Sequence, residues 1–166
     1  MITLLKKVRC FLLVSLTHHI ALPLLKHFRK VKPFPYTPAE LAAMEEGTVG
    51  KALAEFLTNK ELELLSHYAR HDLKHVVLGF DSTEEGELCL QSFMFGNGRV
   101  SFPVLATILF GVLTSPEYWK KMLAAYRKGK SCIPIHTWNW FALVPEKTAA
   151  VQHRIFHTNK LSHEMV

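Results

Sequence analysis

Cysteine is scarce in this chain of 166 residues, and none of it forms a CxxC pair. The three cysteines, Cys10, Cys89 and Cys132, are odd in number and far apart. That pattern argues against a disulfide framework and against a zinc site made of paired cysteines. Isolated cysteines are most often small buried apolar residues. We therefore predict buried free thiols in a protein of a reducing compartment.

Long apolar runs are also missing, although 49% of the residues are hydrophobic. A helix needs about 20 consecutive apolar residues to cross a bilayer. The uncharged run 10–25 is too short and has two histidines at its centre, and the uncharged run 104–114 is shorter still. We predict no membrane-spanning helix, and we interpret 104–114 as a buried central helix.

Acidic residues are absent from the first 32 positions, which hold seven basic side chains. The rest of the chain has thirteen basic and fourteen acidic residues, so no basic stripe suited to a phosphate backbone runs through it. We predict no nucleic-acid partner. Residues 1–36 should form a basic amphipathic segment that packs on the domain or on a membrane surface, and residues 37–166 a single helical domain.

Capping residues, prolines and glycines mark helix ends, whereas the alternation typical of strands is scarce. Thr37 and Thr58 each open a capping-box string, and Gly79 is a natural stop. We predict an all-α fold of about six helices. The expected segments besides 104–114 are 38–46, 48–57, 58–78, 84–95, 116–129 and 145–157. In the segment 58–78 the core-facing positions should be Leu62, Leu65, Ala69, Leu73 and Val76.

The most informative string is His71-Asp72-Leu73-Lys74-His75, followed by eleven residues and then Glu87. On a helix, His71, Asp72 and His75 project close enough together for two imidazoles and a carboxylate to reach one ion. Glu87 can join them if the next helix folds back antiparallel. The spacing therefore predicts a divalent metal site at His71, Asp72, His75 and Glu87.

Two imidazoles and two carboxylates suit zinc, iron or manganese, and magnesium if one imidazole stays outside the coordination shell. One of the four could instead act as a general base, or the group could be an ordinary solvated helix face with an acidic helix start. Arg70, Lys74 and Gln91 are candidates for binding an anionic head group, and Gln91 is expected on the same side of its helix as Glu87. An HD-type phosphohydrolase is a weaker interpretation, because no suitable flanking histidine and distal aspartate are found.

These residues resemble the Coq4 family of ubiquinone (coenzyme Q) biosynthesis proteins, whose signature is HDxxH, eleven residues and then Glu. Gly79 fits the family pattern too, as does the upstream string Glu46-Gly47-Thr48-Val49-Gly50. The resemblance covers roughly residues 45–95. The chain is shorter than typical members, and near its C-terminus Trp138-Asn139-Trp140 and Arg154 correspond only loosely to the family pattern.

The resemblance implies a helical protein that binds a divalent metal beside an apolar cavity for a polyprenylated quinone precursor or another isoprenoid lipid. It implies association with a membrane surface and with other quinone-biosynthesis proteins. The location would be cytoplasmic and peripheral in a bacterium, and the matrix side of the inner membrane in a mitochondrion. The activity it implies is metal-dependent oxidative decarboxylation and hydroxylation of the head-group ring. The alternative is a non-catalytic lipid-binding scaffold, and the sequence leaves open whether the chain forms a homo-oligomer.

Overall fold

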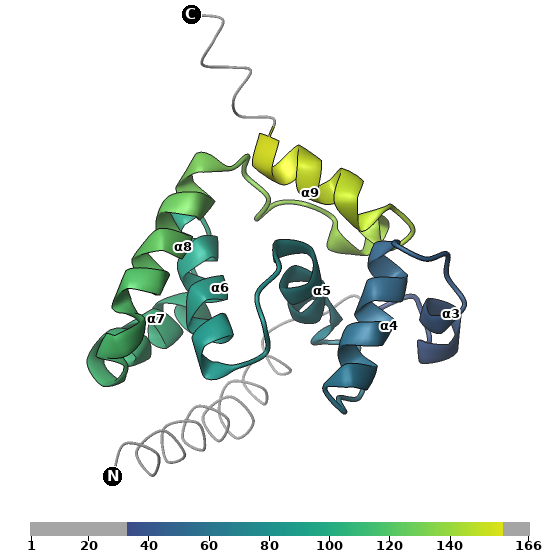
Figure 1. Cartoon of the computed structure of the whole chain (residues 1–166), viewed down its shortest axis with the longest axis horizontal. Helices are drawn as coiled ribbons and strands as arrows, with labels where there is room; N and C mark the ends of the chain where they lie inside the picture. The colour runs from purple at the N-terminus through teal and green to yellow at the C-terminus, as the bar shows by residue number, and fades with distance from the viewer. Residues whose placement is uncertain (1–32, 158–166) are drawn as a thin grey trace, which may run out of the picture.

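The computed structural model describes residues 33–157, which fold into helices joined by short connections (Figure 1). Within that range there are seven α-helices and two short 3-10 helices, η2 and η3, and no strand. The predicted all-α class is confirmed. In chain order the elements are α3 (Pro38–Ala42), α4 (Val49–Asn59), α5 (Ala69–Leu78), α6 (Glu84–Gly96), α7 (Phe102–Thr114), η2 (Pro116–Tyr118), α8 (Trp119–Ser131), η3 (Trp140–Leu143) and α9 (Thr148–His157).

The predicted amphipathic segment 1–36 lies almost wholly outside the described residues, and Cys10 lies outside them as well. Cys89 and Cys132 are free and buried, as predicted. None of the described helices is both long enough and apolar enough to cross a membrane.

Threonine caps start several of these helices. Thr37 begins α3 with a complete capping box, in which its side chain accepts from the Glu40 N–H and its own N–H donates to the Glu40 carboxylate. Thr48 caps α4 by accepting from the Lys51 N–H, and Thr83 caps α6 by accepting from the Gly86 N–H. Each side chain satisfies an N–H that has no partner inside the helix, which stabilises the start by ~1 kcal/mol.

The predicted helix 58–78 is wrong in its first half. Thr58 is not a helix start, because α4 continues through it to Asn59. Glu61 then adopts a left-handed backbone conformation with φ of 53°, and the Leu62 N–H donates to the Leu57 carbonyl, which closes the helix end. The next helix, α5, begins only at Ala69. A capping-box string needs an extended first residue, and here the preceding helix holds that residue in helical geometry.

The core lies where α4, α5, α6 and α9 meet, with α5 in the middle of the described chain (Figure 1). On α5 the fully buried residues recur every four positions at Ala69, Leu73 and Val77, as the helical period requires. The predicted core positions Leu62 and Leu65 are instead 47% and 36% exposed, because they precede the helix. Val76 is partly buried against the core.

Helices α6 and α8 approach each other closely enough for their backbones to touch. A Cβ atom on Gly129 would lie 2.1 Å from the Phe93 carbonyl oxygen, and one on Gly96 would lie 2.1 Å from that of Tyr126. Asn97, just after α6, donates to the carbonyls of Gly129 and Ile133. This clamp fixes α6, and therefore the side chains that α6 presents to α5.

The predicted buried central helix 104–114 is also wrong. A helix does form as α7, but only Val104 and Gly111 among its residues are buried. Gly111 lets α7 sit against Leu88 of α6 and Met122 of α8, since a Cβ there would lie 2.5 Å from the Leu88 side chain. The opposite side of α7 faces solvent. An uncharged composition therefore did not indicate burial in this helix.

Candidate metal centre

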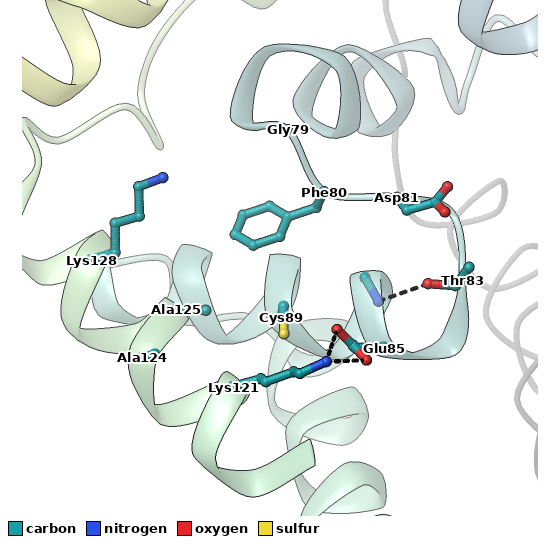
Figure 2. Close-up of a pocket in the computed structure, with 11 residues that line it drawn as sticks. Gly79, Phe80, Asp81, Thr83, Glu85, Cys89, Lys121, Ala124, Ala125 and Lys128 are labelled. Carbon is teal, nitrogen blue, oxygen red and sulfur yellow. Dashed lines mark hydrogen bonds and ion pairs between the residues drawn. The ribbon is translucent and has the colours of Figure 1, made fainter. Parts of the chain in front are cut away.

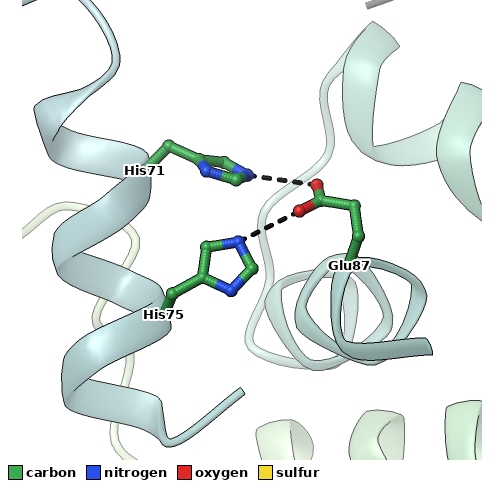
Figure 3. A group of neighbouring side chains, drawn as sticks. All are labelled: His71, His75 and Glu87. Atoms are coloured by element: carbon green, nitrogen blue, oxygen red, sulfur yellow. Dashed lines mark hydrogen bonds and ion pairs between the residues drawn. The ribbon is translucent and has the colours of Figure 1, made fainter. Parts of the chain in front are cut away.

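Three of the predicted metal residues converge in the space between α5 and α6 (Figure 3). His71 Nε2 lies 3.1 Å from Glu87 Oε1, and His75 Nε2 lies 3.0 Å from Glu87 Oε2. Donor atoms of the three side chains all lie within 4.8 Å of one another. His71 and His75 project from the same side of α5, one turn apart, and Glu87 reaches them from the first turn of α6.

The connection between α5 and α6 positions Glu87 through two glycines. Gly79 ends α5 in the left-handed conformation, with φ of 73°, and its N–H and that of Phe80 both donate to the His75 carbonyl. Gly86 lies under the connection, where an added Cβ would meet the Asp81 carbonyl oxygen at 1.9 Å. The absence of a side chain at residue 86 therefore allows the first turn of α6 to approach α5.

His75 is the most enclosed member of the cluster, since only 2% of its side chain is exposed. Its Nδ1 lies 3.0 Å from the Phe80 carbonyl oxygen, and its ring stacks on Phe56 of α4 at a centroid distance of 5.9 Å. A carbonyl oxygen can only accept, so Nδ1 must be the protonated nitrogen. This contact orients the ring and directs Nε2 towards Glu87, as carbonyl partners of metal-binding histidines do.

Polar side chains lie near both ring nitrogens of His71. Its Nδ1 lies 3.6 Å from Asp72 Oδ1, and the Gln91 amide lies 3.4 Å from its Nε2 while donating to Glu87 Oε1 at 2.8 Å. Burial lowers the pKa of His71, but the Glu87 charge and the hydrogen bonds with Asp72 and Glu87 outweigh it and raise that pKa to about 9. Burial raises the pKa of Glu87, but His71 and His75 together hold it well below its ordinary value.

The donor set fits a divalent cation. Both nitrogens of His75 face oxygen atoms that accept hydrogen bonds, and His71 Nε2 faces the same carboxylate. A divalent ion between the helices would be bound by the two Nε2 lone pairs and by Glu87, a combination typical of zinc, iron and manganese.

Asp72 lies beside this group rather than inside it. Its carboxylate is next to His71 Nδ1, and Asp72 is not among the three residues whose donor atoms gather. The arrangement suits an orienting role for Asp72, in which it holds the His71 ring by the nitrogen that faces away from Glu87.

Tyr68 and Phe56 are neighbours of the cluster that the sequence did not single out. The Tyr68 ring lies 5.6 Å from that of His71, and burial together with the charges of Glu87 and Asp72 raises the Tyr68 pKa to about 12. Tyr68 therefore stays a neutral hydroxyl beside the histidines. Its spacing, three residues before His71, was a usable signal, whereas Phe56 comes from another helix and had none.

Arg70 and Lys74, the predicted head-group ligands, contact the C-terminal part of the domain. Arg70 donates to the Trp138 carbonyl at 3.1 Å. Lys74 is buried, with its ammonium nitrogen 5.7 Å from the centre of the Trp140 ring. The third candidate, Gln91, is buried and lies within the cluster through its bond to Glu87.

A separate hollow of about 470 Å³ lies between the α5–α6 connection and α8 (Figure 2). Phe80, Cys89 and Ala125 give it apolar walls, and Lys121 and Lys128 line it from α8. Lys121 is paired there with Glu85. None of the predicted metal residues lines this hollow, but Phe80 belongs to both places, since its carbonyl accepts from His75.

Neither protein-family models nor curated proteins match this chain. Among solved structures it is similar to a protein from Nostoc punctiforme PCC 73102 that is provisionally assigned to ubiquinone biosynthesis. The two superpose with a TM-score of 0.60 over 92% of this chain and 81% of the other. The likeness is one of fold. At 22% sequence identity it supports a shared helical architecture, and the residues of the cluster must be judged by their own geometry.

Proposed function

We propose that this chain is a Coq4-like protein of ubiquinone biosynthesis that holds one divalent metal ion through His71, His75 and Glu87. The observation behind this proposal is the convergence of the three donor groups from two helices within 4.8 Å. The HDxxH spacing to Glu87 and the fold similarity to the Nostoc protein support it independently. The proposal assigns Asp72 and Gln91 to orient His71 and Glu87.

The proposed substrate is a polyprenylated aromatic ring that still bears a carboxylate. In the reaction the bond between ring and carboxylate breaks and releases carbon dioxide, while a hydroxyl group takes the vacated carbon. With water as the hydroxyl source, two electrons and one proton leave, so the reaction needs a two-electron acceptor such as molecular oxygen. A bound divalent ion would supply Lewis-acid stabilisation of negative charge on the ring and its carboxylate.

The chain's own residues would bind and orient this substrate. The Tyr68 ring lies beside His71, and its neutral hydroxyl would donate a hydrogen bond to an anionic group of the substrate. The hollow beside Phe80 has a volume within the range of ligand pockets, roughly 300–1,000 Å³. We assign it to the apolar part of the substrate, because the same short connection forms its wall and orients His75.

The test is a product assay with the purified, metal-loaded protein. A prenylated ring that still bears its carboxylate is incubated with oxygen, and the products are separated by mass. Hydroxylated ring and carbon dioxide should appear with the wild type and with Glu55→Gln, an exposed control on α4. They should be absent with Glu87→Gln. An unchanged substrate with metal-loaded wild type would contradict catalysis and favour the non-catalytic scaffold.

A further inference from the structure

Helix α9 carries a second pair of histidines with the spacing of His71 and His75. His153 and His157 are separated by three residues, and both side chains are exposed. Their ring centroids lie 4.8 Å apart, close to the 4.6 Å between the rings of His71 and His75. Two histidines one turn apart on a helix can bind one metal ion together. The pair on α9 therefore has the separation of a site made of two imidazoles.

The packing of α9 directs this pair to solvent. Val151 and Ile155 are fully buried on the other side of the helix, and the Gln152 side chain donates to the Val77 carbonyl of α5 at 3.0 Å. The two histidine rings are nearly parallel, with an angle of 10° between their planes. A bond from imidazole to a metal lies in the plane of the ring, so both rings must turn towards a shared ion. Exposed side chains make such turns readily.

The position of the pair on α9 suits a cation. His157 is the last residue of the helix, where the carbonyls of the final turn carry a partial negative charge. Among the neighbouring cations, Arg154 pairs with Glu146 at 2.7 Å, and Lys128 of α8 lies over the Phe156 ring at 4.2 Å. The Glu146 carboxylate offsets the charge of Arg154, so the end of the helix still attracts positive charge.

We propose that His153 and His157 bind a second divalent transition-metal ion, more weakly than the centre between α5 and α6 binds its own. Two imidazoles, with water in the remaining positions, suit zinc, nickel or copper, whereas magnesium prefers oxygen ligands. The other centre adds the Glu87 carboxylate and is more enclosed, so its ion is retained through purification and the second ion is lost. A bound ion would tie together the last turn of α9, whose Phe156 ring packs against Phe93 of α6.

Calorimetric titration of the metal-free, full-length protein with zinc tests this second site. The wild type should bind one equivalent tightly and a second one more weakly. The matched variants are His153→Gln, His157→Gln and the double variant, which change only exposed side chains. Because one ion is bound by both rings, each single variant should weaken the second equivalent by about tenfold or more, nearly as much as the double variant does. Magnesium should not replace zinc at this site.

An unchanged second equivalent in the double variant would overturn the proposal. So would single variants that each remove only half of the weaker binding, since that identifies two independent histidines rather than one shared site. The tight equivalent should be the same in the wild type and in all three variants. Its absence from the wild type would contradict the proposed metal centre but leave the comparison at α9 intact, so the two failures are distinguishable.

Discussion

The α5–α6 pair and the α7–α8 pair place polar and apolar residues in opposite relation to solvent. On α5 the buried residues include Lys74 and His75, and on α6 they include Gln91. On α7, which has no charged residue, five large apolar side chains are exposed instead. The polar cluster lies between two packed helices and is partly or fully buried, whereas the large apolar side chains of α7 are exposed. The difference shows that burial in this fold follows from which helices pack together rather than from composition.

The largest predicted difference between the two regions is in the loss of stability when one leucine of each is replaced by alanine. Leu73→Ala opens a cavity in the core on α5, the helix that carries His71 and His75, and should lower the free energy of unfolding by about 2–5 kcal/mol. Leu109→Ala, at a residue that is 59% exposed, should change it by no more than about 0.5 kcal/mol. Urea denaturation of both variants measures the difference. Similar losses would mean that α7 is buried in solution.

A smaller loss of stability is expected from a substitution at Gly86, which lets the first turn of α6 lie under the α5–α6 connection. Gly86→Ala places a Cβ 1.9 Å from the Asp81 carbonyl oxygen, so the turn must shift and Glu87 with it. We expect a destabilisation of about 1–3 kcal/mol together with weaker metal binding. Ser82→Ala, in the same connection and exposed, is the control. Full metal affinity in Gly86→Ala would show that Glu87 does not depend on this contact.

Gln91 should affect metal affinity more than stability. The variant Gln91→Met keeps the side-chain volume but removes the hydrogen bond to Glu87 Oε1, so the carboxylate loses its orientation. Loss of such a supporting bond weakens metal binding by about 10–100-fold. Calorimetric titration of the metal-free protein measures this, with Ser92→Ala as a buried polar neighbour for comparison. An unchanged dissociation constant would remove Gln91 from the account.

The smallest expected effect is a pH dependence of the metal-free protein. The folded-state pKa of His71 is raised from 6.5 to about 9, so its protonated form stabilises the fold fully below pH 6.5. That contribution is lost as the pH rises through about 9. Glu87→Gln removes the carboxylate that raises this pKa. The stability difference between wild type and Glu87→Gln should therefore shrink on going from pH 6 to above pH 9, as urea denaturation would show, and a constant difference would contradict the assignment.

Much of the centre could be predicted because its signals are local. Gly79 and Thr83 mark the end of α5 and the start of α6, and the HDxxH spacing predicts two histidines one turn apart. The Phe80 carbonyl that orients His75 could not be predicted in the same way. Every residue has a backbone carbonyl, so the sequence does not indicate which one accepts a hydrogen bond.

Two predictions were wrong, the helix start at Thr58 and the burial of 104–114, and both depend on how neighbouring elements are arranged. Thr58 resembles a helix cap in isolation, but the preceding helix extends through it. The uncharged stretch of α7 resembles a buried helix, but no described element covers its Phe102 and Leu109 side. In both cases the arrangement of neighbouring segments decides where a helix begins or whether it is buried, and a local sequence pattern does not indicate that arrangement.

The central claim is that His71, His75 and Glu87 hold one divalent ion. The direct measurement is native mass spectrometry combined with elemental analysis of the freshly purified protein. We predict one divalent ion per chain in the wild type and in Glu55→Gln, and none in Glu87→Gln, while circular dichroism shows that all three remain helical. Undiminished metal in Glu87→Gln, or no metal in the wild type after addition of zinc, iron and manganese, would contradict the account.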